Sequence, residues 1–180
     1  DILGVGAQGL GLLRSAEAVG AVTMGVLLAH LPPMRRAGRT MLWAVAGFGA
    51  ATVGLGVSQW FPLSLAMMFL IGALDNVSVV VRHTLVQMLT PDEMRGRVSA
   101  VNSVFIVSSN DLGGLESGVT ARLFGPVLSV VGGGLGAIAA VVGVGRIWPE
   151  ILSTGSLADI RPIEPGRDQE DIDEELAARL

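Results

Sequence analysis

Two uncharged stretches of the sequence are each long enough to cross a lipid bilayer as a helix, and they constrain the fold more than any other feature. The first covers residues 40–59, which are 20 residues without a charge, and the second covers residues 125–145, which are 21. About 18 or more apolar residues in a helix span the ~30 Å hydrocarbon core of a bilayer. A third uncharged stretch, residues 62–74, ends at Asp75. We therefore expect a membrane protein.

The whole pattern predicts an all-α membrane protein with five transmembrane helices. Only 16% of the residues are charged, against about 25% in a typical soluble domain. Residues 1–150 form the membrane part, and residues 151–180, with eight acids and three arginines, are expected to be a disordered acidic tail in the cytoplasm. The five helices are placed at about residues 11–31, 40–59, 62–85, 98–124 and 126–148.

The arginines predict how these helices are oriented in the membrane. All 12 basic residues are Arg, and ten of them fall on one side of the five-helix arrangement. Basic residues near helix ends are retained in the cytoplasm. The N-terminus is therefore expected outside and the C-terminus inside. The ten are Arg35, Arg36, Arg39, Arg82, Arg95, Arg97, Arg146, Arg161, Arg167 and Arg179, while Arg14 and Arg122 fall on the other side.

The absence of Cys excludes a Cys-based metal site, and the two isolated His do not make a metal site, so no bound metal is expected. No nucleophile and base occur in a pattern typical of catalysis, so we do not expect an enzyme. No cofactor and no nucleic-acid partner are expected either. The lipid bilayer is the partner that the composition predicts directly.

Ionisable residues inside the predicted spans are candidates for function, because a charge in hydrocarbon is costly and is placed against protein or water. Asp75 could be a proton-coupling carboxylate, or a structural hydrogen-bonded acid paired with Arg82 or with the charged loop that follows this span. The span 98–124 is polar on two faces, which indicates that protein encloses both. Its candidate cavity residues are Asn110, Asp111 and Glu116. We expect Asp111 to matter more for coupling than Asp75.

Small residues repeat at helical spacing and predict close contacts between helices. Ala46, Ala50 and Gly54 recur every fourth residue, and Gly132 with Gly136 forms a G-x-x-x-G motif. Ala139 and Gly143 repeat that step.

The segment "TPDEMRGR", residues 90–97, is a charged connection between two apolar spans. Asp92 and Glu93 favour the start of a helix, and Arg95 and Arg97 would hold the connection in the cytoplasm. From spacing alone, its role could be to anchor the topology and nothing more.

The longer passage "DNVSVVVRHTLVQMLTPDEMRGRVSAVNSVF", residues 75–105, resembles the Major Facilitator Superfamily, and within it bacterial exporters of siderophores, drugs and macrolides. The passage "NDLGGLESGVTARLFGPVLSVVGGG" continues the resemblance. "RRAGRTML", residues 35–42, is similar to a degenerate copy of the family's signature loop, matching at Arg36, Gly38 and Arg39. The acid of that loop is absent, since Pro33 and Met34 stand nearby.

The resemblance, which covers about residues 1–150, implies helices 8 to 12 of a twelve-helix transporter, so we expect a fragment that lacks its N-terminal half. Signature-loop candidates are Arg36, Gly38, Arg39, Asp92, Arg95, Gly96 and Arg97. The implied function is proton-coupled export of small amphipathic compounds by alternating access in the bacterial inner membrane. The alternative is a membrane scaffold or partner-binding protein that has this fold and does not transport.

Overall fold

The computed structural model describes residues 6–31 and 37–147, and within these ranges it is built of helices without strands. The five predicted helices are all present. Four boundaries differ from prediction by three residues or more: the first and second helices begin earlier, the third ends later, and the fourth begins within the arginine-containing segment. The elements are α1 Gly6–His30, α2 Ala37–Val57, α3 Phe61–Leu89, the short 3₁₀ helix η1 Asp92–Met94, α4 Arg95–Phe124 and α5 Pro126–Ile147.

Four of these helices are long and apolar enough to cross a membrane: α1, residues 38–57 of α2, α3 and α5. Helix α4 is also long enough, since its 30 residues extend about 45 Å at the helical rise. It does not meet the same standard of apolar composition, because it carries charged and polar residues along its length. The fourth predicted span is therefore present as a helix, but it is not among the helices whose length and composition alone indicate a membrane span.

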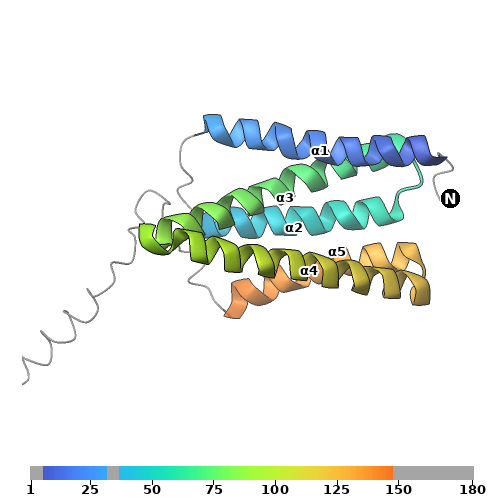
Figure 1. The fold of residues 1–180 in the computed structure, drawn as a ribbon. Helices are drawn as coiled ribbons and strands as arrows, with labels where there is room; N and C mark the ends of the chain where they lie inside the picture. Colours follow the sequence, from blue (N-terminus) through green and yellow to red (C-terminus); the bar gives the residue numbers. More distant parts are fainter. Residues whose placement is uncertain (1–5, 32–36, 148–180) are drawn as a thin grey trace, which may run out of the picture.

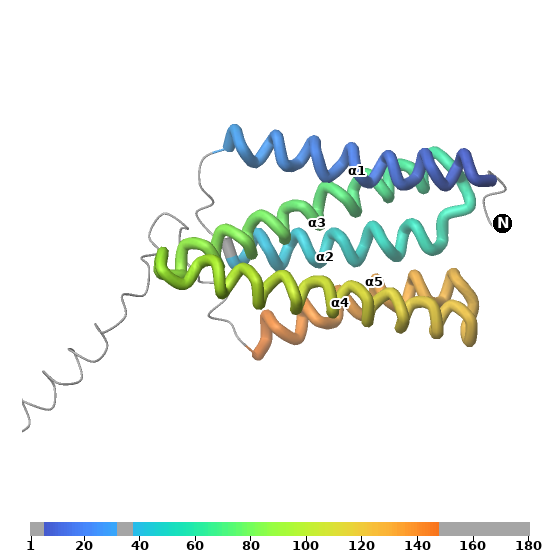
Figure 2. Tube along the Cα trace, in the orientation of Figure 1, coloured from blue at the N-terminus to red at the C-terminus, as the bar shows by residue number. Residues whose placement is uncertain are grey.

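The helices pack side by side in an order that differs from their order along the chain. Helix α1 packs on α3, α3 on α2, α2 on α5, and α5 on α4, as Figure 1 shows. Helices that follow one another in sequence run in opposite directions (Figure 2). The C-terminal ends of α1, α3 and α5 therefore lie at the same end of the molecule as the N-terminal ends of α2 and α4.

Buried side chains are few within the described residues, and one cluster of them lies where α1, α2 and α3 meet. Ala44, Val77 and Val81 form the buried cluster. The partly buried residues that pack against it are Met24, Leu28, Met41, Leu85 and Met88. In contrast, α4 has no buried residue.

Glycines bring two helix pairs into backbone contact. A Cβ added to Gly72 of α3 would overlap the backbone oxygen of Glu17 in α1, and one added to Gly20 would overlap that of Phe69. Helices α2 and α5 meet reciprocally, since a Cβ on either Gly49 or Gly134 would lie 2.7 Å from the backbone oxygen of the other. These residues set how closely the helices approach.

The small-residue motifs predicted from sequence were wrong for α5. A Cβ on Gly132, Gly136 or Gly143 would meet nothing within 4 Å, whereas Gly134, between the two glycines of the motif, makes the contact with α2. The spacing of glycines indicates that a helix can pack closely, but the face that does so depends on how the helix is rotated about its axis.

The turn between α4 and α5 requires a glycine. Gly125 has φ of +88°, a conformation that costs little only without a side chain. Its backbone N–H donates to the Ala121 oxygen at 3.0 Å and closes α4. Pro126 then begins α5 at the position where a missing N–H costs least.

Candidate functional site

Polar and charged side chains from α1 and α3 meet around a pocket of about 330 Å³. Helix α1 contributes Arg14 and Glu17, and α3 contributes Asp75 and Asn76. Asp75 lies 14 residues after the start of α3, about 21 Å along the helix. The close approach of the helices at Gly72, next to the pocket, brings the two pairs together. Two carboxylates and one guanidinium therefore face the same space halfway along an apolar helix pair.

Not every polar side chain around this pocket has a hydrogen-bond or ion-pair partner among the residues described. The side-chain oxygen of Asn76 is buried and has no hydrogen-bond partner among the residues described. Asp75 is exposed to the pocket. The predicted alternative in which Asp75 pairs with Arg82 is not observed, because the ion pair found in the described ranges is the one between Asp92 and Arg95.

Sequence reasoning did not assign Arg14, Glu17 or Asn76 to a site. The available signal was that Arg14 and Glu17 are ionisable residues inside an apolar span, as Asp75 is. Their convergence depends on α1 packing against α3, and the sequence does not indicate which helices are neighbours.

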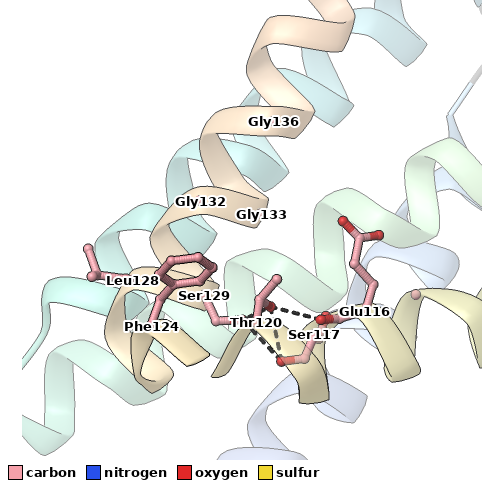
Figure 3. Close-up of a pocket in the computed structure, with 10 residues that line it drawn as sticks. Glu116, Ser117, Thr120, Phe124, Leu128, Ser129, Gly132, Gly133 and Gly136 are labelled. Carbon is pink, nitrogen blue, oxygen red and sulfur yellow. Dashed lines mark hydrogen bonds between the residues drawn. The ribbon is translucent and has the colours of Figure 1, made fainter. Parts of the chain in front are cut away.

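A second pocket, of about 620 Å³, lies between α4 and α5 (Figure 3). Glu116, Ser117 and Thr120 line it from α4, and Ser129 lines it from α5. The Thr120 and Ser129 hydroxyls are 2.7 Å apart, and Ser129 Oγ also donates to the Ser117 backbone oxygen at 3.2 Å. The Glu116 carboxylate points away from these hydrogen bonds, as Figure 3 shows. It forms no ion pair with any residue in the part of the chain that the structure describes.

The structure separates the three candidates predicted on α4. Glu116 lines the pocket with α5, together with Gly113 and Thr120 from the same predicted face. Asn110 and Asp111 are exposed and line neither of these two pockets. Within the described ranges α4 packs mainly on α5, so enclosure of both its polar faces by protein stays a prediction.

The signature-loop candidates from Asp92 to Arg97 lie at one end of the molecule, where α3 ends and α4 begins. Arg95 Nη2 lies 2.9 Å from Asp92 Oδ1, and Arg95 Nε donates to the Thr90 oxygen at 3.4 Å. Both contacts tie the first turn of α4 to the connection that precedes it. Arg97 is exposed and lines a mostly apolar pocket with residues of α3 and α4. Gly96 meets nothing within 4 Å of an added Cβ.

The second candidate loop lies partly within the described residues. Gly38 and Arg39 are in the first turn of α2, and Arg39 is exposed. Arg36 lies outside the described residues.

The chain is similar in sequence to known exporters. It is 27% identical over 135 residues to the enterobactin exporter EntS of Shigella flexneri, which covers 75% of this chain and 32% of the relative. It is 28% identical over 127 residues to the enterobactin exporter EntS of Escherichia coli O1:K1, covering 71% of this chain and 29% of the relative. No family model and no solved structure matches the chain.

These matches confirm the resemblance drawn from residues 75–105. The chain is homologous, over about three quarters of its length, to an exporter of the Major Facilitator Superfamily. It spans about a third of the length of the curated relatives it matches.

Proposed function

We propose that this chain, as a homologue of Major Facilitator Superfamily exporters, forms part of a secondary transporter that exports small amphipathic compounds in exchange for protons. The similarity to enterobactin exporters over 135 residues is the observation that carries the proposal. Because the chain spans about a third of those relatives, the complete transporter contains further helices. The N-terminal half of the transporter is the partner that we propose for this chain, with the lipid bilayer around both.

Ionisable groups at mid-helix support a transport role. A charged side chain in hydrocarbon costs several kcal/mol on insertion scales, so such groups occur where they face water, protein or a substrate path. Asp75 and Glu116 line pockets in this chain. A substrate or a proton could reach carboxylates in these positions without crossing a fully packed core.

Asp111 supports a site shared with the rest of the transporter. It is exposed near the middle of α4, and an exposed acid at that depth requires a neighbour other than lipid. We propose that Asn110 and Asp111 face the cavity between this chain and the missing half. Movement of the two halves would expose Asp111 alternately to each side of the membrane.

The proposed orientation places the arginine-containing connections and the C-terminus in the cytoplasm of a bacterial cell. Arg39, Arg95, Arg97 and Arg146 all lie at one end of the helices, the end drawn at the left in Figure 1. Retention of basic residues in the cytoplasm gives the orientation. Residues 151–180 are proposed as a cytoplasmic tail outside the membrane part.

The test uses the complete transporter in inverted membrane vesicles, with ethidium as an amphipathic probe. Asp111→Asn and Glu116→Gln should each abolish the proton-dependent part of ethidium accumulation, and Asp75→Asn should reduce it. Glu93→Gln removes an exposed acid from the connection before α4 and should leave accumulation unchanged. The 180-residue chain alone should not accumulate the probe.

The alternative, a membrane scaffold that does not transport, gives a different result in the same vesicles. Folded protein that accumulates neither ethidium nor enterobactin, with or without a proton gradient, would favour the scaffold. Normal accumulation by all three acid variants would contradict the proposed proton coupling.

A further inference from the structure

Helices α2 and α5 form a groove whose composition changes from apolar to basic at one end. The groove has a volume of about 440 Å³. Leu42, Trp43 and Ala46 line it from α2, and Val141, Val142 and Gly145 line it from α5. Arg39 completes the lining at the end where α2 begins. A single charged side chain therefore closes an otherwise apolar surface groove.

The groove lies on the part of the chain that is best suited to contact hydrocarbon. Between Arg39 and the end of α2 there is no charged residue, and α5 has none before Arg146. Both helices are long and apolar enough to cross a membrane. The exposed fraction of Trp43 is 69% and that of Val142 is 44%. An apolar groove that opens to hydrocarbon is filled by hydrocarbon, and in a bilayer this is the acyl chain of a lipid.

The basic end of the groove indicates which kind of lipid headgroup it would bind. Arg39 is exposed and forms no ion pair with any residue in the described ranges. Arg146 directly follows Gly145, in the last turn of α5 at the same end, and is also exposed. Trp43 lies one turn into the groove from Arg39, and Trp side chains favour the level of lipid headgroups. Basic pockets between transmembrane helices bind anionic headgroups.

We propose that this groove is a binding site for one anionic phospholipid, with an acyl chain between α2 and α5 and the phosphate at Arg39 and Arg146. A guanidinium binds a phosphate by paired, charge-assisted hydrogen bonds. The apolar lining favours a lipid over free phosphate as the ligand. The site is separate from both pockets that contain acidic residues, and it requires a membrane location but not a transport activity.

Quenching of Trp43 fluorescence by lipids with brominated acyl chains measures occupancy directly. The full 180-residue chain, with Trp60 and Trp148 replaced by Phe, leaves Trp43 as the single emitter. It is reconstituted into phosphatidylcholine vesicles that contain a small fraction of either brominated phosphatidylglycerol or brominated phosphatidylcholine. We expect phosphatidylglycerol to quench Trp43 at a several-fold lower mole fraction than phosphatidylcholine does.

Variants test the two halves of the site separately. Arg39→Gln should weaken phosphatidylglycerol binding about fivefold, the factor that corresponds to about 1 kcal/mol per basic residue near an anionic surface. Gly145→Leu should block the acyl chain, and its Cβ would meet nothing within 4 Å. Arg97→Gln removes a charge at the same end outside the groove and should change little.

Controls distinguish a lipid bound in the groove from lipid that is merely attracted to the basic end of the molecule. A chain with Trp60 as its single emitter reports the opposite end of α2 and should show no preference for phosphatidylglycerol. Equal quenching of Trp43 by the two brominated lipids would overturn the proposal. So would recovery of Trp43 emission on addition of inorganic phosphate, or Arg97→Gln weakening binding as much as Arg39→Gln. Helical circular dichroism of each variant confirms that the chain is folded.

Discussion

At the scale of single residues, the absence of a side chain decides how closely the helices pack. Gly72 and Gly20 allow α1 and α3 to meet backbone to backbone, and Gly49 and Gly134 do the same for α2 and α5. Dispersion contacts and close backbone approach are the main attractions between helices in lipid, where burial of apolar surface contributes little. The same contact between α1 and α3 positions Glu17 beside Asp75, so packing and site geometry depend on the same glycines.

Adding one methyl group at two glycines should therefore have opposite effects. Gly72→Ala should lower the stability of the chain by about 1–3 kcal/mol or more, because its Cβ would overlap the Glu17 oxygen and force α1 and α3 apart. Gly143→Ala, where nothing lies within 4 Å, should be neutral or stabilise by up to about 1 kcal/mol through helix propensity. Thermal unfolding in detergent, followed by circular dichroism, measures both. Equal stability of the two variants would contradict the close contact of α1 with α3.

Some of the residues that line the pockets could be identified from the sequence, and others could not. The acids Asp75 and Glu116 could be selected because a charge in an apolar span is conspicuous, and both line pockets. Arg14 and Asn76 could not be joined to Asp75, since that requires knowing that α1 lies against α3. Gly132 and Gly136 line the pocket shared with α4, whereas the close backbone contact of α5 with α2 is made by Gly134. Periodicity fixes which residues share a face, while the neighbour of that face is decided by the whole helix arrangement.

At the scale of elements, α4 differs from the other four helices in the polarity of its side chains. Its five charged residues and its many hydroxyl and amide side chains make it the most polar of the five helices. The limits of the helices were predictable to within a few residues because uncharged stretches, Pro126 and Gly125 mark them. The hydrogen bonds between α4 and α5 were not predictable, because they join serine and threonine hydroxyls of two helices whose relative rotation the sequence does not indicate.

We expect the two helices to behave differently when each is tested alone. In a translocon insertion assay, residues 126–147 should insert efficiently as an isolated segment and residues 95–124 should insert poorly. An acid near the centre of a helix costs about 2.5–3.5 kcal/mol on the insertion scale, and α4 has Asp111 and Glu116. Replacing both by Leu should restore insertion. Efficient insertion of unmodified residues 95–124 would show that α4 does not need α5.

At the scale of the whole molecule, the alternating direction of the five helices gathers most of the basic residues of the described ranges at one end, while Arg14 and Arg122 lie towards the other. The connection at Asp92–Met94 and the start of α2 share an end with the last turn of α5, as Figure 2 shows, while the turn between α2 and α3 lies at the other end. That opposite turn is uncharged: Ser58 is buried there and accepts a hydrogen bond from Ser64 at 2.9 Å. The two ends therefore differ in charge as a consequence of the fold.

Cysteine labelling should reveal this difference as a membrane orientation. The chain has no Cys, so a single substitution gives a unique label without removing others. Gln59→Cys, at an exposed position in the uncharged turn, should react with a membrane-impermeant maleimide added to intact cells. Met94→Cys, 46% exposed and beside Arg95, should react only after the membrane is permeabilised. The reason is that basic residues are retained in the cytoplasm. Labelling of Met94→Cys in intact cells, with Gln59→Cys protected, would mean that the chain has the opposite orientation and that the arginines at this end do not determine it.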